Sequence, residues 1–304
     1  MCAVAPVPMS AARAFAPLDL ARLISIALIW GVNNVMAKLA LNALPPLFTV
    51  CLRFLIVLGA VIWLVAPLPA GKVRAMLAML LLVGPVHFGI QYTGLAMAHE
   101  LAPMVIAMQL WIPCSVLFAG LVLGERIGAL RQAGVGLAFL GVGALSFDPI
   151  VFHQLGALAL VAGAAACYGL GAVMVRRIGA AIDPWAVQAW IALVTAPVMG
   201  LGSAAIEHNQ FAAAAAAPWW VWAFVAFGAI VSGIIANAFM FRLVQTYEVS
   251  RTTPYLLLTP LISFLMAALV LGDHVSARVA LGGALTLAGV ALVALAERRF
   301  RAGS

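Results

Sequence analysis

Charge is the scarcest feature of this sequence. Charged side chains make up 8% of its 304 residues, whereas hydrophobic side chains make up 66%. A soluble domain is closer to half apolar and a quarter charged. The composition therefore excludes a soluble globular protein and predicts a protein embedded in a lipid bilayer.

Acidic side chains are absent from the middle of every long apolar segment. All nine aspartates and glutamates lie at or near the ends of these segments. An exporter of lipophilic cations usually needs a carboxylate inside the membrane that holds the cation and exchanges it for protons. The sequence therefore argues against export of multidrug cations. His87 is left as the one mid-segment group that titrates near neutral pH.

Motifs for metal binding and catalysis are also lacking. The four cysteines share no metal-ligand spacing, which predicts free thiols and no metal site. His99-Glu100 has no second histidine to complete a zinc motif, and neither a nucleotide-binding loop nor a GxSxG sequence occurs. We expect neither an enzyme nor a primary pump on this chain, and no cofactor.

Long apolar runs are what the sequence has in abundance. A helix that crosses a bilayer needs roughly 20 apolar residues, and ten segments meet that requirement. The alanine-rich connection at 207–218 forms either a short interfacial helix or an irregular loop. The predicted spans are residues 21–42, 47–66, 75–97, 102–123, 130–148, 154–175, 184–206, 219–243, 251–271 and 277–296.

Basic residues gather on one side of these predicted spans. With the N-terminus inside and the spans alternating in direction, thirteen of the sixteen lysines and arginines fall on the inner side. Lys38, Arg53 and Arg278 are the exceptions. Because cytoplasmic loops of membrane proteins are enriched in Lys and Arg, we expect cytoplasmic tails at 1–19 and 298–304. The net charge of +7 is then explained by the basic residues of the cytoplasmic connections, and we expect no nucleic-acid partner.

The two halves of the chain resemble each other. Residues 29–50 align with residues 167–188, and residues 121–145 align with residues 269–293, where LVLGER matches LVLGDH. Each half has five spans, an odd number, so the second half enters the membrane from the opposite side. We predict an all-α integral membrane protein of two inverted five-helix repeats, a plan found in secondary transporters. The predicted repeats are residues 20–149 and 150–297.

A family resemblance is carried by the first two spans and by the ends of both repeats. WGVNNVMAKLALNALPPLFTVCLRF resembles the start of an EamA-type transporter, and LVLGERIGALRQAGVGLAFLGV and LVLGDHVSARVALGGALTLAGV resemble the ends of the two EamA repeats. The resemblance covers nearly the whole chain after residue 20. It implies the drug/metabolite transporter superfamily, ten spans, the bacterial inner membrane and export of amino acids or related metabolites. The second repeat departs from the first at Gly171-Ala172, where the first has Asn33-Asn34.

Polar side chains follow one face of the third predicted span. Gly84, His87, Gln91, Gly94 and Ala98 have the 3-4 spacing of a helix stripe. These groups either bond to adjacent helices and hold the bundle together, or line an aqueous path. Other spans supply matching amides, hydroxyls and indoles, which suit a zwitterion or a neutral polar solute. The candidate substrate-binding residues are Trp30, Asn34, His87, Gln91, Gln109, Trp111, Tyr168, Asn237 and Tyr255.

Three residues are candidates for gating or for proton coupling. His87 is a hypothetical proton-coupling site because imidazole titrates near neutral pH. Lys38 lies close enough to the outer side to extend its amine to the lipid headgroups. Arg53 lies about two turns inside its span, where it either caps neighbouring carbonyl groups or forms a positive outer gate for a carboxylate.

Small residues recur at matching positions in the fifth and tenth spans. Gly134, Ala138 and Gly141 give the fifth span a small face, and the tenth has Gly282, Thr286 and Gly289. Such faces allow close helix approach, so we expect the two helices to pack together at the periphery. The alternative is that these faces mediate a homodimer, whereas the first arrangement fits a monomer.

These observations together favour a secondary transporter. We expect export of small polar metabolites, amino acids or derivatives, by alternating access through a central cavity between the repeats. Pro113 is expected to bend the fourth span, and the other prolines and the glycines provide further bending points. A passive channel-like facilitator of the same fold, or an exporter of other solutes such as drugs, remains the alternative. The expected partners are a small polar solute and the lipid bilayer.

Overall fold

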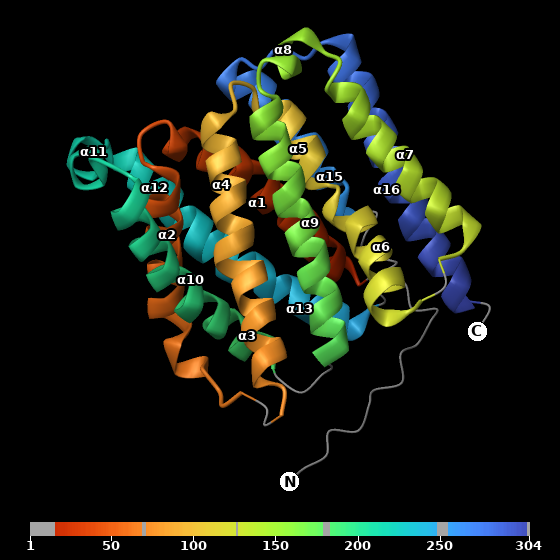
Figure 1. Ribbon diagram of the computed structural model, residues 1–304, viewed down its shortest axis with the longest axis horizontal. Helices are drawn as coiled ribbons and strands as arrows, with labels where there is room; N and C mark the ends of the chain where they lie inside the picture. The colour runs from red at the N-terminus through yellow and green to blue at the C-terminus, as the bar shows by residue number, and fades with distance from the viewer. Residues whose placement is uncertain (1–15, 69–70, 126, 179–182, 248–254, 303–304) are drawn as a thin grey trace.

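The computed structural model describes residues 16–302, apart from 69–70, 126, 179–182 and 248–254. These residues form helices and turns, and no strand occurs among them (Figure 1). Eight helical segments are long and apolar enough to cross a membrane. Two shorter apolar helices, Ala129–Leu145 and Leu258–Leu271, accompany them. The fold is therefore that of an all-helical integral membrane protein.

The first half of the chain follows the predicted spans closely. Its elements are α1 (Pro17–Leu41), α2 (Pro46–Val61) with a 3-10 turn η1 (Ile62–Leu64), α3 (Val73–Leu81), a π-helical turn η2 (Leu82–Val86), α4 (His87–Met97), α5 (Leu101–Met108), α6 (Trp111–Leu123) and α7 (Ala129–Leu145). Helices α3, η2 and α4 form one continuous span.

The second half contains the short α8 (Pro149–Phe152) and then α9 (Leu155–Ile178), α10 (Pro184–Ile206), α11 (Gln210–Ala216), α12 (Trp219–Ala226), the π-helix η3 (Phe227–Ile235), α13 (Ala236–Thr246), α15 (Leu258–Met266), the π-turn η4 (Ala267–Leu271) and α16 (Ala277–Ala302). Helix α11 lies in the alanine-rich connection, so the short-helix alternative for that segment is the right one. Helix α16 extends into the segment predicted as a tail from residue 298. Most of the predicted N-terminal tail, residues 1–15, lies outside the described residues.

Breaks and π-turns interrupt several of the long spans near their middles. The fourth span breaks between Met108 and Trp111, because Pro113 has no N–H to bond the carbonyl of Gln109. Pro85 lies within η2 in the third span. The eighth span passes through the nine-residue η3. Such irregular turns leave backbone groups outside the regular helical pattern and are frequent at functional sites.

Helix packing couples the two halves in a reciprocal pattern. Helix α1 packs against α15 and against the α12–η3–α13 segment, while α9 packs against α4 and α6. The first span of each half thus contacts the third and fourth spans of the other. In addition, α2 packs on α10, and α7 packs on α16.

Helices α7 and α16 lie side by side along one edge of the molecule (Figure 1). Their glycines allow backbone contact. A Cβ atom added at Gly141 would lie 2.5 Å from Thr286 N and 2.7 Å from the Gly282 carbonyl oxygen. One added at Gly134 would lie 2.8 Å from the Gly289 carbonyl oxygen. The predicted pairing of these two helices is confirmed.

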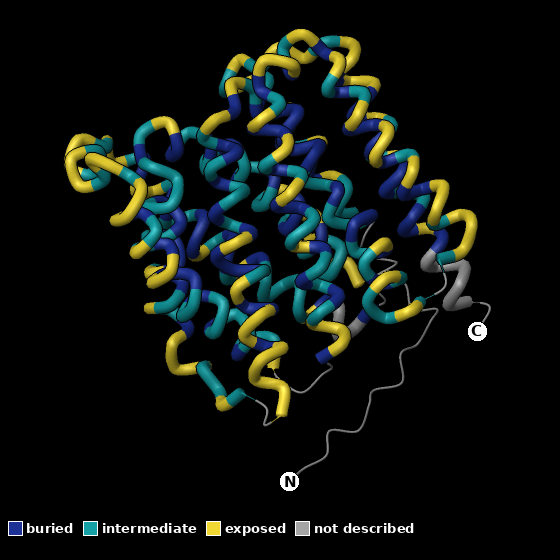
Figure 2. The backbone as a smooth tube through the Cα atoms, viewed as in Figure 1, coloured by how far each residue is buried: buried dark blue, intermediate teal, exposed yellow. Residues whose placement is uncertain are grey.

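Exposed and buried positions alternate along the outer helices (Figure 2), and many of the exposed positions carry large apolar side chains. Leu140, Leu269 and Leu281 are among the exposed leucines. An exposed apolar surface of this kind suits contact with lipid chains. We call the end that carries α8 the α8 end, and the opposite end, where α3 begins, the α3 end.

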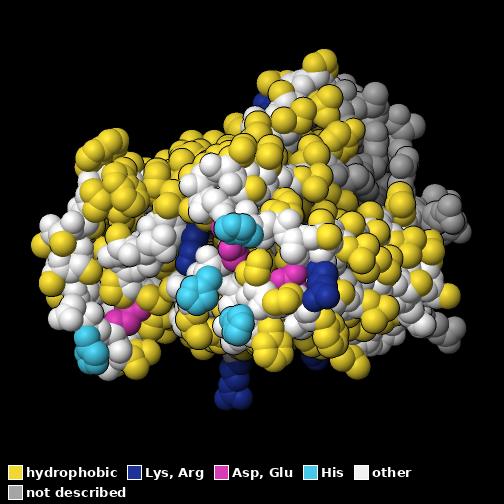
Figure 3. Space-filling view, turned by 90° about the horizontal axis from the view of Figure 1, so that it is seen from above, with side chains coloured by type: hydrophobic (Ala, Val, Ile, Leu, Met, Phe, Trp, Pro, Cys, Tyr) yellow, Lys and Arg dark blue, Asp and Glu magenta, His cyan; other side chains and the backbone are white. Residues whose placement is uncertain are grey.

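The α8 end carries a distinct set of side chains. Exposed histidines from four connections lie there together with acidic and basic groups (Figure 3). They are His99, His153, His208 and His274. The polar contacts of this end hold several helix termini in place, as shown below.

Candidate functional site

A cavity of about 300 Å³ lies among helices from both halves of the chain. Its wall takes residues from α1, α2, α4, α6, α9, α10, η3, α13 and α15. This volume is at the small end of the range of about 300 to 1,000 Å³ for small-molecule sites. The arrangement therefore provides a shared interior space for a small solute.

The structure places most of the predicted site residues in this wall. The residues that line the cavity are Trp30, Asn34, His87, Gln91, Gln109, Trp111, Tyr168 and Asn237. Tyr255 is the exception, because it packs beside the buried side chains of Leu23 and Ile26 and lies outside the cavity wall. A turn at Leu257 separates Tyr255 from α15, whose Thr259 does line the cavity.

Aromatic rings form a continuous part of the wall. The His87 ring lies 4.8 Å from Phe88 and 5.0 Å from Tyr168, and Trp111 lies 5.5 Å from Tyr168, all between ring centres. His87 Nδ1 donates a hydrogen bond to the Ala164 carbonyl at 2.9 Å, since a carbonyl oxygen only accepts. This bond fixes the ring orientation of a side chain that is 9% exposed.

Amide side chains in the wall also bond to neighbouring groups. Asn34 donates to the Ser263 hydroxyl at 3.0 Å, and Asn237 donates to the Gly233 carbonyl at 2.8 Å. Gln91 Nε2 lies 3.6 Å from the sulfur of Met108. Asn34 thus joins α1 to α15 while it lines the cavity, whereas the bond of Asn237 stays within its own span.

Arg53 brings a full positive charge to the cavity wall. Its guanidinium donates to the Tyr92 hydroxyl at 2.5 Å and lies 5.5 Å from the centre of the Phe88 ring. The expectation that Arg53 caps carbonyl groups is wrong, because its partner is a phenol. Helix α2 carries it inward from Pro46, and only 9% of the residue is exposed.

Lys38 differs from its predicted position. The residue is 7% exposed, and its amine donates to the carbonyls of Leu95 at 3.0 Å and Ala98 at 2.5 Å. The expectation that Lys38 extends to the headgroups is wrong, because these carbonyls at the C-terminal end of α4 bind the amine instead. A cation at this end of a helix is also favoured by the helix dipole. Lys38 therefore fixes the end of α4 and does not line the cavity.

Sequence reasoning missed several residues of the wall. Gln188 on α10 lines the cavity and donates to the Gly233 carbonyl at 3.3 Å. A signal existed, since Gln188 is the only amide side chain in its span. Tyr92 and Phe88 lie off the polar stripe of α4, so their part in the wall follows only from the packing around Arg53.

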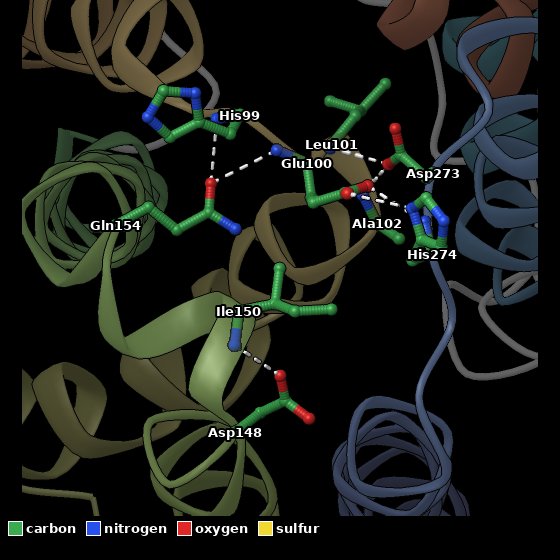
Figure 4. Close-up of polar contacts among 9 residues, drawn as sticks. All are labelled: His99, Glu100, Leu101, Ala102, Asp148, Ile150, Gln154, Asp273 and His274. Atoms are coloured by element: carbon green, nitrogen blue, oxygen red, sulfur yellow. Dashed lines mark hydrogen bonds and ion pairs between the residues drawn. The ribbon is translucent and has the colours of Figure 1, made fainter.

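The connection between α4 and α5 is held by side chains from distant parts of the chain (Figure 4). Gln154 accepts hydrogen bonds from the backbone N–H groups of His99 and Glu100. Asp273 accepts from the N–H groups of Leu101 and Ala102 at 2.6 and 2.8 Å, which caps the start of α5. The second half of the chain thus anchors the helix termini of the first half.

Two carboxyl groups of the α8 end have pKa values shifted in opposite directions. Burial and the neighbouring Asp273 raise the pKa of Glu100, which accepts from the backbone N–H of His274. Burial also acts to raise the pKa of Asp148, but hydrogen bonds from Ser276 and from the N–H of Ile150 outweigh it and lower that pKa. Asp148 is therefore held as a carboxylate.

The α3 end is joined by a different set of contacts. Arg176 at the end of α9 forms an ion pair with Glu125, which follows α6. Their side chains are 55% and 34% exposed. Lys72 donates to the Ile178 carbonyl at 2.6 Å. In the alignment of the two halves, Arg176 corresponds to Lys38, and Glu125 corresponds to Asp273.

A bundle of apolar helices around a polar cavity is the architecture of membrane transporters. The chain belongs to the EamA-like transporter family, which matches residues 20–147 and 155–295. It is thereby a member of the drug/metabolite transporter superfamily and a multi-pass protein of the bacterial inner membrane.

Curated relatives cover most of the chain. It is 26% identical over 278 residues to a protein of Escherichia coli (strain K12) named "Probable amino-acid metabolite efflux pump", covering 87% of this chain and 91% of the relative. A protein of Salmonella typhimurium with the same name is 25% identical over 274 residues, with 87% and 91% covered. The "Uncharacterized transporter YvbV" of Bacillus subtilis is 28% identical over 284 residues, and 88% of each is covered.

A solved crystal structure of a protein has the same overall fold. The TM-score is 0.61 at 21% sequence identity, and the match covers 94% of this chain and 99% of the other. This likeness shows the fold alone.

Proposed function

We propose that this protein is a secondary transporter that exports small polar metabolites, amino acids or derivatives, by alternating access. The observation that carries the proposal is the cavity of about 300 Å³, whose wall combines amides, indoles, phenols and one guanidinium from both halves of the chain. The relatives named as amino-acid metabolite efflux pumps support the same substrate class. The small volume favours a metabolite over a larger drug molecule.

The proposed architecture is ten spans in two inverted five-helix repeats, 20–149 and 150–297, with both termini in the cytoplasm. Three observations support it. The EamA family matches the chain twice, the first span of each half packs against the third and fourth spans of the other, and the basic residues favour one side. In such a plan the substrate site lies between the repeats, near the middle of the membrane.

Alternating access requires that each end of the cavity opens while the other is shut. At the α8 end, Lys38 and Asp273 bind the two sides of the α4–α5 connection, Lys38 at the carbonyl of Ala98 and Asp273 at the N–H of Leu101. Their counterparts at the α3 end, Arg176 and Glu125, pair with each other in a more exposed position. We infer that the buried contacts close the α8 end in this conformation and that exchange between the two pairs accompanies transport.

His87 is the proposed proton-coupling site. It lies in the cavity wall between Phe88 and Tyr168, where its protonation would change the charge that faces the solute. Transport is measured against imposed pH gradients in the wild type and in His87→Asn. Coupling that is unchanged in the variant would eliminate this role while leaving the transporter proposal intact.

The transporter proposal is tested with purified protein in liposomes and a panel of radiolabelled amino acids. We expect saturable uptake and counterflow, meaning that an unlabelled amino acid inside accelerates entry of the labelled one. A passive channel gives neither. The matched variants are Tyr168→Leu, which changes the cavity wall, and Tyr255→Leu, which changes a tyrosine outside it. Transport per folded protein should fall in the first variant and persist in the second.

A further inference from the structure

Arg53 is a charged side chain held in the interior without a charged partner of opposite sign. It is 9% exposed, and the described residues that line the cavity include no aspartate or glutamate. Among the described residues, its hydrogen-bond partner is the Tyr92 hydroxyl. A buried charge without a partner of opposite sign destabilises a fold strongly. Inside a membrane such a charge is, by default, functional.

The surroundings of Arg53 also include an unpaired hydrogen-bond acceptor, which suits a donor such as the ammonium of a zwitterion. The Asn33 side chain is 8% exposed, and its oxygen has no hydrogen-bond partner. Both side chains meet the backbone at Gly228, where an added Cβ atom would lie 3.0 Å from Asn33 Oδ1 and 3.8 Å from Arg53 Cζ. Because Gly228 has no side chain, η3 approaches the Asn33 oxygen closely, with the guanidinium at ordinary contact distance. The site thus holds a cation, an unpaired amide oxygen and a phenol, without a fixed anion.

We propose that Arg53 binds the carboxylate of the transported solute and thereby restricts transport to molecules that carry this group. The proposal rests on the transporter function above and narrows its substrate class. The planar guanidinium has five N–H donors in a fork that matches a carboxylate, and the bond to Tyr92 uses one of them. The aromatic rings of Tyr168 and Trp111 lie in the same wall and accommodate the apolar part of the solute.

The net charge of a solute should then determine how tightly it binds in the cavity. An anion neutralises Arg53, a zwitterion does so while its ammonium bonds to amide or carbonyl oxygens, and a cation is repelled. The affinity should therefore be lower for phenylalanine amide than for N-acetylphenylalanine and phenylalanine, which both carry the carboxylate. These three probes share one apolar side chain, and the comparison of phenylalanine with phenylalanine amide changes the carboxylate alone.

Binding of the three probes to the purified full-length protein is measured by titration calorimetry. We expect the stated order in the wild type and binding of N-acetylphenylalanine that is about 10- to 100-fold weaker in Arg53→Gln. Arg53→Lys should retain part of the affinity, because it keeps the charge and loses the fork. Arg278→Gln removes one positive charge at the α8 end, outside the cavity wall, and should bind as the wild type does.

Asn33→Asp provides a second variant that keeps Arg53. It places a carboxylate beside the guanidinium and should weaken N-acetylphenylalanine binding while relieving the exclusion of phenylalanine amide. Equal affinity of the wild type for all three probes, or unchanged binding in Asn33→Asp and Arg53→Gln, would overturn the proposal. Binding in the stated order without flux in liposomes would overturn the transporter function and retain the carboxylate site.

Discussion

Close contact between α7 and α16 gives a prediction that the structure allows us to work out in numbers. Replacing Gly141 by alanine adds a methyl group where α16 leaves no room. The added Cβ atom would lie 2.4 Å from Thr286 Oγ1, 2.5 Å from Thr286 N and 2.7 Å from the Gly282 carbonyl oxygen. Gly136 lies on the same helix, and a Cβ atom there meets nothing within 4 Å. Gly136→Ala is therefore the matched control.

The size of the effect follows from these distances. Ordinary van der Waals contact of a Cβ atom begins at 3.4 Å, so α16 must move away by about 0.7 to 0.9 Å, because backbone atoms cannot rotate aside. Overpacking of this kind costs about 1 to 3 kcal/mol. Alanine gains about 0.5 to 1 kcal/mol over glycine in a helix interior, and both variants share this gain. Gly141→Ala should thus be about 1 to 3 kcal/mol less stable than Gly136→Ala.

The assay is thermal unfolding in detergent with a thiol-reactive fluorophore. The Cys114 thiol is 5% exposed and becomes reactive when the bundle opens. We expect a melting temperature below that of the wild type for Gly141→Ala, and one equal to or above it for Gly136→Ala. Equal melting temperatures for the two variants would refute the claim that backbone contact between these helices stabilises the protein.

Further predictions concern the two ends. Lys38→Gln should lower the melting temperature, because two carbonyls at the end of α4 lose a charged donor, at a cost of about 1 to 3 kcal/mol; an unchanged melting temperature would contradict this role. Since the pKa of Glu100 is raised, its contribution to stability is present below pH 4.5 and is lost as the pH rises through the raised pKa. Melting temperatures measured from pH 4.5 upward should therefore decline more in the wild type than in Glu100→Gln, and parallel curves would argue against it. Exchanging the charges of the α3 end, as Arg176→Glu with Glu125→Arg, should restore transport that either single variant impairs, and failure of the double variant would contradict the paired role.

Hydrophobic run length made most of the fold predictable. The bounds of the predicted segments agree with the described helices to within a few residues at most ends, and eight of these helices are long and apolar enough to cross a bilayer. The bend expected at Pro113 is observed as a break in the fourth span, because the missing N–H of proline acts on the helix locally. The π-turns at η2 and η3 were not predictable, because they depend on tertiary packing around the cavity.

The partners of the polar side chains could not be predicted from the sequence. Lys38 and Arg53 were both placed near the outer side, yet their partners are the carbonyls of another helix and a phenol, respectively. Tyr255 lies outside the cavity wall, because a turn at Leu257 separates it from α15, which begins at Leu258 and carries Thr259. Spacing along one helix gives the face that a residue occupies, whereas the group opposite it depends on the neighbouring helix.

The central claim is that a solute passes through the cavity as its two ends open in turn. The direct measurement is side-specific labelling of Ala37→Cys, a cavity-wall position, in a variant without the four native cysteines and with a membrane-impermeant maleimide. We predict labelling from each side of the membrane, with an amino acid gradient increasing it on one side and decreasing it on the other. Labelling from one side only, whatever the gradient, would contradict alternating access through this cavity.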